Sequence, residues 1–278
     1  MRVTLRQGLI WGAVAIAFAG VSTAAPPPPA PAAAPRWIVN ESGAACTLGR
    51  LLVGTPAATV VVLTYPGSDE YELRLIADDW TGRIGGARQA LDLTLAPGDV
   101  RYTRGPSTPL AAIEGAQVLR FADLPSGFLN AFGRAETLTV SSGGRPIASY
   151  PLRLAAPASR ALAACERAKL IEWGADPAGL EPGAVRPTPI GNPDEWTGGY
   201  VMHSLRDRRF AVLRLNLAAD GRPERCTILE SNNGRYARRY CSKLMENARY
   251  EPARDARGNP VRSIVVHWKD WVFLTFTP

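Results

Sequence analysis

The sequence is poor in the side chains on which most enzyme chemistry and metal binding depend. Its 278 residues include only two histidines, His203 and His267, and contain no C-x-x-C pair. The G-x-S-x-G motif, a common setting for a hydrolase serine, is also missing. Zinc and iron sites draw mainly on clusters of histidine and cysteine. We therefore expect no catalytic, metal or cofactor site, and the sequence favours a binding protein over an enzyme.

Long hydrophobic runs are lacking outside the N-terminal segment. Arg2 and Arg6 precede an apolar stretch at residues 9–21, and Ser22-Thr23-Ala24 supplies the small residues that a signal peptidase requires. Residues 1–24 therefore predict a signal peptide and export to the periplasm. The alternative is an uncleaved segment that anchors the chain in the inner membrane, with the rest facing the periplasm.

The four cysteines predict two disulfides. In an oxidising compartment this is the more common use of four cysteines, and three pairings exist. One pairing is favoured, because Cys226 is predicted on the inner face of a strand and Cys241 on the inner face of the helix that follows. Cys46 and Cys165 would then join the two ends of the first domain.

Residues 37–173 predict a mostly β domain, which follows an extended Pro- and Ala-rich spacer at residues 25–36. Residues 58–65 form a β-branched run, Pro66-Gly67 closes it, and residues 71–77 alternate in polarity. This is the pattern of a hairpin. Further strands are expected at residues 90–95, 116–121, 137–140 and 147–152, and helices at residues 123–132 and 157–173.

Residues 174–193 are rich in Pro and Gly and predict a linker. Residues 194–278 then predict the order helix, strand, strand, helix, strand. These elements are expected at residues 194–205, 210–218, 224–231, 235–249 and 262–276. The expected fold class is α+β: a mostly β domain closed by a helix, followed by a small antiparallel sheet packed on helices.

Basic residues outnumber acidic ones, 32 to 25, and the excess lies in the C-terminal part. Arg235, Arg238 and Arg239 share the outer face of the helix expected at residues 235–249. A nucleic acid would bind such a face, but export argues against that partner. The remaining alternatives are an anionic envelope surface and an ordinary solvated helix face.

Three segments near the C-terminal end carry a family pattern. They are FAVLRLNLAADGRPERCTILESNNG (residues 210–234), ARYEPARDARGNPV (residues 248–261) and VVHWKDWVFL (residues 265–274). Together they resemble the TonB C-terminal domain family, in its cysteine-containing periplasmic variants. The resemblance implies a TonB C-terminal-like fold for residues 194–278.

The resemblance also implies a mode of binding. In the family, the last strand is a sheet edge to which an extended peptide from an outer-membrane receptor adds as a further strand. The partner-binding residues on this strand would be Ile264, Val265, Val266, His267, Trp268, Lys269 and Trp271. Charge, and not the resemblance, adds Arg235, Arg238 and Arg239 of the basic helix face as candidate partner-binding residues. We expect a non-enzymatic periplasmic protein that binds an envelope or outer-membrane receptor partner, with a role in TonB-dependent transport. The alternatives are a structural or scaffold protein that dimerises through this domain and, less favoured, a periplasmic hydrolase.

Overall fold

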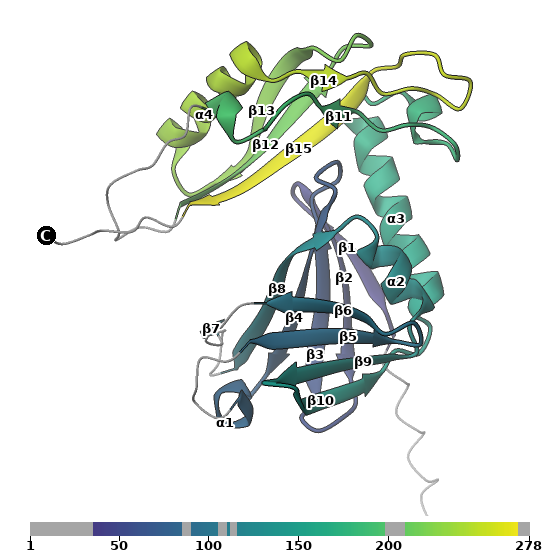
Figure 1. Ribbon diagram of the computed structural model, residues 1–278, viewed down its shortest axis with the longest axis vertical. Coiled ribbons are helices and arrows are strands. Elements are labelled where there is room, and N and C mark those ends of the chain that lie inside the picture. Colours follow the sequence, from purple (N-terminus) through teal and green to yellow (C-terminus); the bar gives the residue numbers. More distant parts are fainter. Residues whose placement is uncertain (1–35, 85–89, 105–109, 112–115, 198–208, 272–278) are drawn as a thin grey trace, which may run out of the picture. The chain divides into compact units, whose positions relative to one another are not determined.

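The computed structural model describes residues 36–84, 90–104, 110–111, 116–197 and 209–271, and it is a mixed α+β structure (Figure 1). Every strand pair in these ranges is antiparallel. The first domain contains β1 (Ile38–Ser42), β2 (Ala45–Leu52), β3 (Ala58–Thr64), β4 (Glu70–Ala77), α1 (Trp80–Ile84), β5 (Leu91–Ala96), β6 (Val100–Arg104), β7 (Leu110–Ala111), β8 (Gln117–Pro125), α2 (Phe128–Arg134), β9 (Thr137–Ser142), β10 (Arg145–Pro151) and α3 (Ala155–Glu172). The rest contains the short 3-10 helices η2 (Pro177–Leu180) and η3 (Glu195–Thr197) and the elements β11 (Thr188–Pro189), β12 (Arg209–Leu217), β13 (Pro223–Ser231), α4 (Gly234–Asn247), β14 (Tyr250–Glu251) and β15 (Ser263–Trp271).

The first domain is a β-sandwich. One sheet has the strand order β1-β2-β3-β4-β8-β7 and the other β10-β9-β5-β6, and the two lie face to face (Figure 1). Burial alternates along β3, where Val60 and Val62 are buried and Val61 is not. This period of two places one face of each strand in the core between the sheets. Leu93 and Val140 of the second sheet are buried in the same core.

Two helices close this domain. α3 packs against α2, β1 and β2, and a disulfide joins Cys46 of β2 to Cys165 of α3. The sequence placed the start of the preceding helix at Asp123, and this prediction was wrong. Asp123 lies inside β8 with φ of 55°, and β8 continues because Leu124 pairs with Tyr71 and is buried. α2 therefore begins only at Phe128.

The C-terminal domain is a three-stranded sheet with the order β13-β12-β15 and with α4 on one face (Figure 1). Leu213, Leu215 and Leu217 of β12 are buried in one cluster with Leu244 of α4. A second disulfide joins Cys226 of β13 to Cys241 of α4. Both disulfides are the pairs expected from the sequence: the packing of a helix on a sheet gave Cys226–Cys241, and Cys46–Cys165 was the pair that remained.

The segment predicted as a linker (residues 174–193) forms backbone hydrogen bonds with the C-terminal domain. β11 pairs with β14, Val185 forms an isolated bridge with Arg254, and the Asp176 N–H donates to Arg262 O at 3.1 Å. Several backbone groups of this segment are thus paired with the C-terminal domain, although the segment is rich in Pro and Gly. Of the helix expected at residues 194–205, the described part contains only η3, and the remainder lies outside it.

Candidate functional site

Among the residues that the structure describes, β15 is an edge of its sheet, because β12 alone pairs with it in the strand order β13-β12-β15. The Val266 N–H donates away from β12, to Gly67 O at 3.0 Å. Since backbone groups alternate in direction along an antiparallel pair, this bond fixes which residues face outward. The outward set in the described strand is Ile264, Val266, Trp268 and Asp270, whereas Val265, His267 and Lys269 turn their backbone groups to β12.

The side chains of β15 lie on two buried or half-buried faces. On one face, Ile264 and Val266 are buried, and Trp268 packs against their cluster, which includes Leu170 and Trp173 from the end of α3 and its cap. On the other face, Val265 packs against the core beneath α4, and His267 Nε2 lies 2.6 Å from the Tyr250 hydroxyl. The side chains of Lys269 and Trp271 lie outside the described part of the chain. The predicted partner-binding residues of β15 thus point their side chains to two different faces of the sheet. What they share is their position on one edge strand.

The turn between β3 and β4, which we call the β3–β4 turn (residues 65–69), contacts this edge. The Ser68 N–H donates to Tyr65 O at 2.9 Å, and Gly67 has φ of +94°. Proline before a residue with positive φ is the pattern of a type II turn. A Cβ atom on Gly67 would lie only 3.2 Å from Ile264 O. Glycine is therefore required here both by the backbone conformation and by the close approach to β15.

Side chains reinforce the contact between the β3–β4 turn and the C-terminal sheet. The Tyr65 hydroxyl donates to a carboxylate oxygen of Glu230 at 2.8 Å, and burial and this carboxylate raise the pKa of Tyr65, so the hydroxyl stays protonated. The Tyr65 and Trp268 rings meet edge to face with centroids 5.1 Å apart. The Arg120 guanidinium lies over the Trp268 ring, 5.5 Å from its centroid. Aromatic and cation–π contacts of this kind each stabilise by about 1 kcal/mol.

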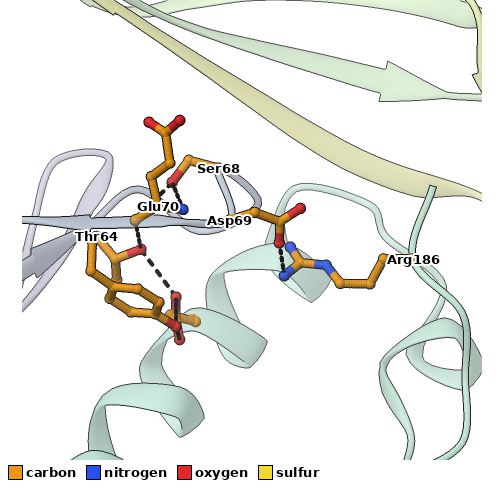
Figure 2. Close-up of polar contacts among 7 residues, drawn as sticks. Thr64, Ser68, Asp69, Glu70 and Arg186 are labelled. Atoms are coloured by element: carbon orange, nitrogen blue, oxygen red, sulfur yellow. Dashed lines mark hydrogen bonds and ion pairs between the residues drawn. The ribbon is translucent and has the colours of Figure 1, made fainter. Parts of the chain in front are cut away.

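A pocket of about 280 Å³ opens beside the β3–β4 turn. Its walls are residues 67–70, residues 264–268 of β15 and the prolines at 187, 189 and 193. Figure 2 shows the polar groups on the turn side, where Asp69 forms an ion pair with Arg186. The Ser68 hydroxyl lies 3.2 Å from Glu70 O, which stiffens the turn (Figure 2). The pocket thus borders the outward backbone groups of β15.

Next to the turn, α3 presents a carboxylate to the hairpin. Glu166 Oε1 lies 3.1 Å from the Thr64 hydroxyl, and Glu166 Oε2 lies 3.2 Å from the Tyr71 hydroxyl. Burial raises the pKa of Glu166, and the hydrogen bonds from Thr64 and Tyr71 oppose that rise. This arrangement ties the last turns of α3 to the β3–β4 hairpin, and we assign it a structural role.

Glu166→Gln should remove a pH-dependent loss of stability. Because the pKa of Glu166 is raised on folding, the folded protein holds this proton more tightly than the unfolded chain. The stabilising contribution is then present when the carboxyl is protonated and is lost as the pH rises above its ordinary value of 4.5. Urea unfolding at several pH values between 4 and 7 should show the variant gaining stability over the wild type as the pH rises. A difference that stays constant with pH would contradict this assignment.

The predicted basic residues lie on a separate surface. Arg235, Arg238 and Arg239 are exposed on α4, which packs against β13 and β12. β15 is at the opposite edge of the sheet from β13. The structure therefore does not bring the arginines of α4 together with the β15 edge, and one small partner would contact one surface or the other.

Comparisons of the chain with protein-family models, curated proteins and solved structures give no match. None of the helices in the described ranges is long and apolar enough to cross a membrane. Across those same ranges, no group of three or more His, Cys, Asp or Glu side chains is placed to hold a metal ion.

Sequence reasoning missed the residues that cover β15 from the first domain. Tyr65, Gly67 and Arg120 belong to this group, and Glu230 of β13 binds the Tyr65 hydroxyl from the C-terminal sheet. Pro66-Gly67 was identified as a turn, but nothing in its composition says what the turn contacts. One signal was available in retrospect: the first residue of the turn, Tyr65, is aromatic, where a polar residue is more usual.

Proposed function

We propose that residues 194–278 form a TonB C-terminal-like domain that binds an extended peptide along the outward edge of β15. The peptide would belong to an envelope or outer-membrane receptor partner, and the protein would act without catalysis, in TonB-dependent transport. The observation that carries this proposal is the alternation set by the Val266 N–H, which leaves the backbone of Trp268 and Asp270 directed away from the sheet. Outward N–H and C=O groups on an edge strand accept another strand by backbone hydrogen bonds.

A periplasmic location is part of the proposal. The N-terminal signal-like segment supports it, and the two disulfides are compatible with an oxidising compartment. A scaffold protein that dimerises through the same edge is the second candidate, because a β15 strand from a second copy would satisfy the same outward groups. The following experiment separates the two.

Asp270→Pro should abolish or strongly weaken partner capture without unfolding the domain. Proline removes the outward N–H of Asp270, which β12 does not use, so the sheet should remain intact. Losing a backbone hydrogen bond to the partner should reduce capture at least about fivefold. The measurement is chemical crosslinking of the full chain in the periplasm, followed by mass spectrometry of the captured proteins and by circular dichroism of the purified variant.

Lys269→Pro is the matched control, because its N–H turns inward to β12. This variant should lower the melting temperature, whereas Asp270→Pro should not. If Asp270→Pro captures as much as the wild type while Arg238→Glu with Arg239→Glu abolishes capture, the partner is held by α4 and the edge mechanism is wrong. A captured species that is only a second copy of this chain, with a doubled mass in light scattering, would favour the scaffold function.

A further inference from the structure

We propose that the β3–β4 turn is an intramolecular cover for part of the β15 edge, so that a peptide adds alongside Ile264 and Val266 only after this turn has moved away. The inference rests on the proposed peptide binding at β15 and concerns how that site is regulated. It gives the first domain a role, which is to limit the length of edge open to a partner.

The backbone contact has the geometry of one rung of strand addition. Gly67 O accepts the outward Val266 N–H at 3.0 Å, the same bond that an incoming peptide carbonyl would make. The Cβ position of Gly67 is 3.2 Å from Ile264 O and 3.5 Å from Val266 N, so the turn occupies the space beside both outward residues. A peptide and the turn cannot occupy this place together.

The cover divides the edge into two parts. With the turn in place, Ile264 and Val266 are shielded, whereas in the described part of the chain the turn backbone forms no hydrogen bond with the outward groups of Trp268 and Asp270. With the turn removed, all four outward residues line one continuous edge. Because each added pair of backbone hydrogen bonds strengthens strand addition, the open form should bind an extended peptide more tightly than the covered form.

The contacts that hold the β3–β4 turn against β15 are mostly polar or aromatic. They come from several different elements. Tyr65 is bound to Glu230 of β13, its ring meets Trp268 of β15, and Asp69 is paired with Arg186. Figure 2 shows the Asp69–Arg186 pair beside β15. If the covered form dominates, the apparent affinity of a peptide is reduced by the fraction of molecules that are open, and loosening these contacts should raise it.

The experiment adds the β3–β4 turn to the protein as a separate peptide and measures whether that peptide binds β15. The probe is a fluorescently labelled, head-to-tail cyclic peptide that copies residues 63–72, titrated into the full chain and followed by anisotropy. Gly67→Ala forces a side chain against β15 in a strained conformation and should displace the intramolecular turn. We expect it to bind the probe at least about tenfold more tightly than the wild type. Amide exchange should show rapid exchange at Val266 in the variant alone and slow exchange once the probe is added.

Gly98→Ala is the matched control. Gly98 also follows a proline and has φ of +101°, but nothing lies within 4 Å of its Cβ position. It carries the same backbone strain without a contact to β15, and it should bind the probe as the wild type does. Tyr65→Phe and Glu230→Gln loosen the cover without altering the turn backbone, and they serve if Gly67→Ala does not fold; each should raise probe affinity several-fold.

The outcomes separate this inference from the proposed function. Equal probe affinity in the wild type, Tyr65→Phe, Glu230→Gln and every folded Gly67 variant would overturn the cover. Periplasmic crosslinking with the same variants is the second measurement, and it tests whether a partner is captured. If the probe behaves as expected but neither the wild type nor the loosened variants capture an envelope protein, the cover stands and the proposed partner is wrong. If the wild type and the loosened variants capture a partner equally, the site binds but the turn does not regulate it.

Discussion

Replacing Cys46 and Cys165 together by alanine should lower the free energy of unfolding of the first domain by about 4 kcal/mol. The disulfide joins residues 119 positions apart, so it closes almost the whole domain into one loop. Such a crosslink stabilises mainly by restricting the unfolded chain, and this effect grows with loop length. Urea unfolding under non-reducing conditions measures it.

The double variant Cys226→Ala with Cys241→Ala is the internal comparison. Its disulfide closes a loop with a sequence separation of 15, for which about 3 kcal/mol is expected. The longer loop should therefore show the larger loss. An equal or reversed order would mean that native packing around the sulfurs, and not the unfolded chain, decides the effect. Adding a reductant to the wild type should reproduce the sum of both losses.

The strands and the disulfides could be predicted because local signals specify them. Alternation in β3 and β4, with Pro66-Gly67 between them, predicts a hairpin whatever surrounds it. The pairing of Cys226 with Cys241 follows because a strand and the next helix along the chain pack together. The outward register of β15 was left open by the sequence. Alternation offers two registers, and only the bond between Val266 and Gly67 decides between them.

The contact between the two domains could not be predicted, because it joins segments far apart in the chain. Glu72 illustrates this. It alternates along β4 with Tyr71 and Leu73 of the sandwich core, and so lies on the other face of that strand. In the structure it is completely buried beside Arg74 and Arg120. No local pattern distinguishes a solvent-facing glutamate from one that residues distant in the sequence bury.

Glu72→Ala should be among the most destabilising single substitutions in the first domain, with a loss of about 3 kcal/mol. The Glu72 side chain is 0% exposed and its carboxylate lies 2.6 Å from Arg120, whose side chain is 12% exposed. Arg74 Nε approaches the other oxygen at 2.5 Å and is 40% exposed. Without the carboxylate, the buried Arg120 guanidinium keeps its desolvation cost and loses its counter-charge. Thermal and urea unfolding of the full chain give the measurement.

A double variant tests whether the loss of the Glu72 charge opposite Arg120 is the cause. Replacing Glu72 and Arg120 together by methionine removes both charges and keeps much of the buried volume, so it should be more stable than Glu72→Ala by at least about 1 kcal/mol. Arg120 also contacts the Trp268 ring, so some loss should remain in the double variant. Exposed Glu246, paired with Lys243 on α4, is the surface control, and Glu246→Ala should cost less than about 0.5 kcal/mol. A double variant as unstable as Glu72→Ala would show that the carboxylate acts through packing and not through its charge opposite Arg120.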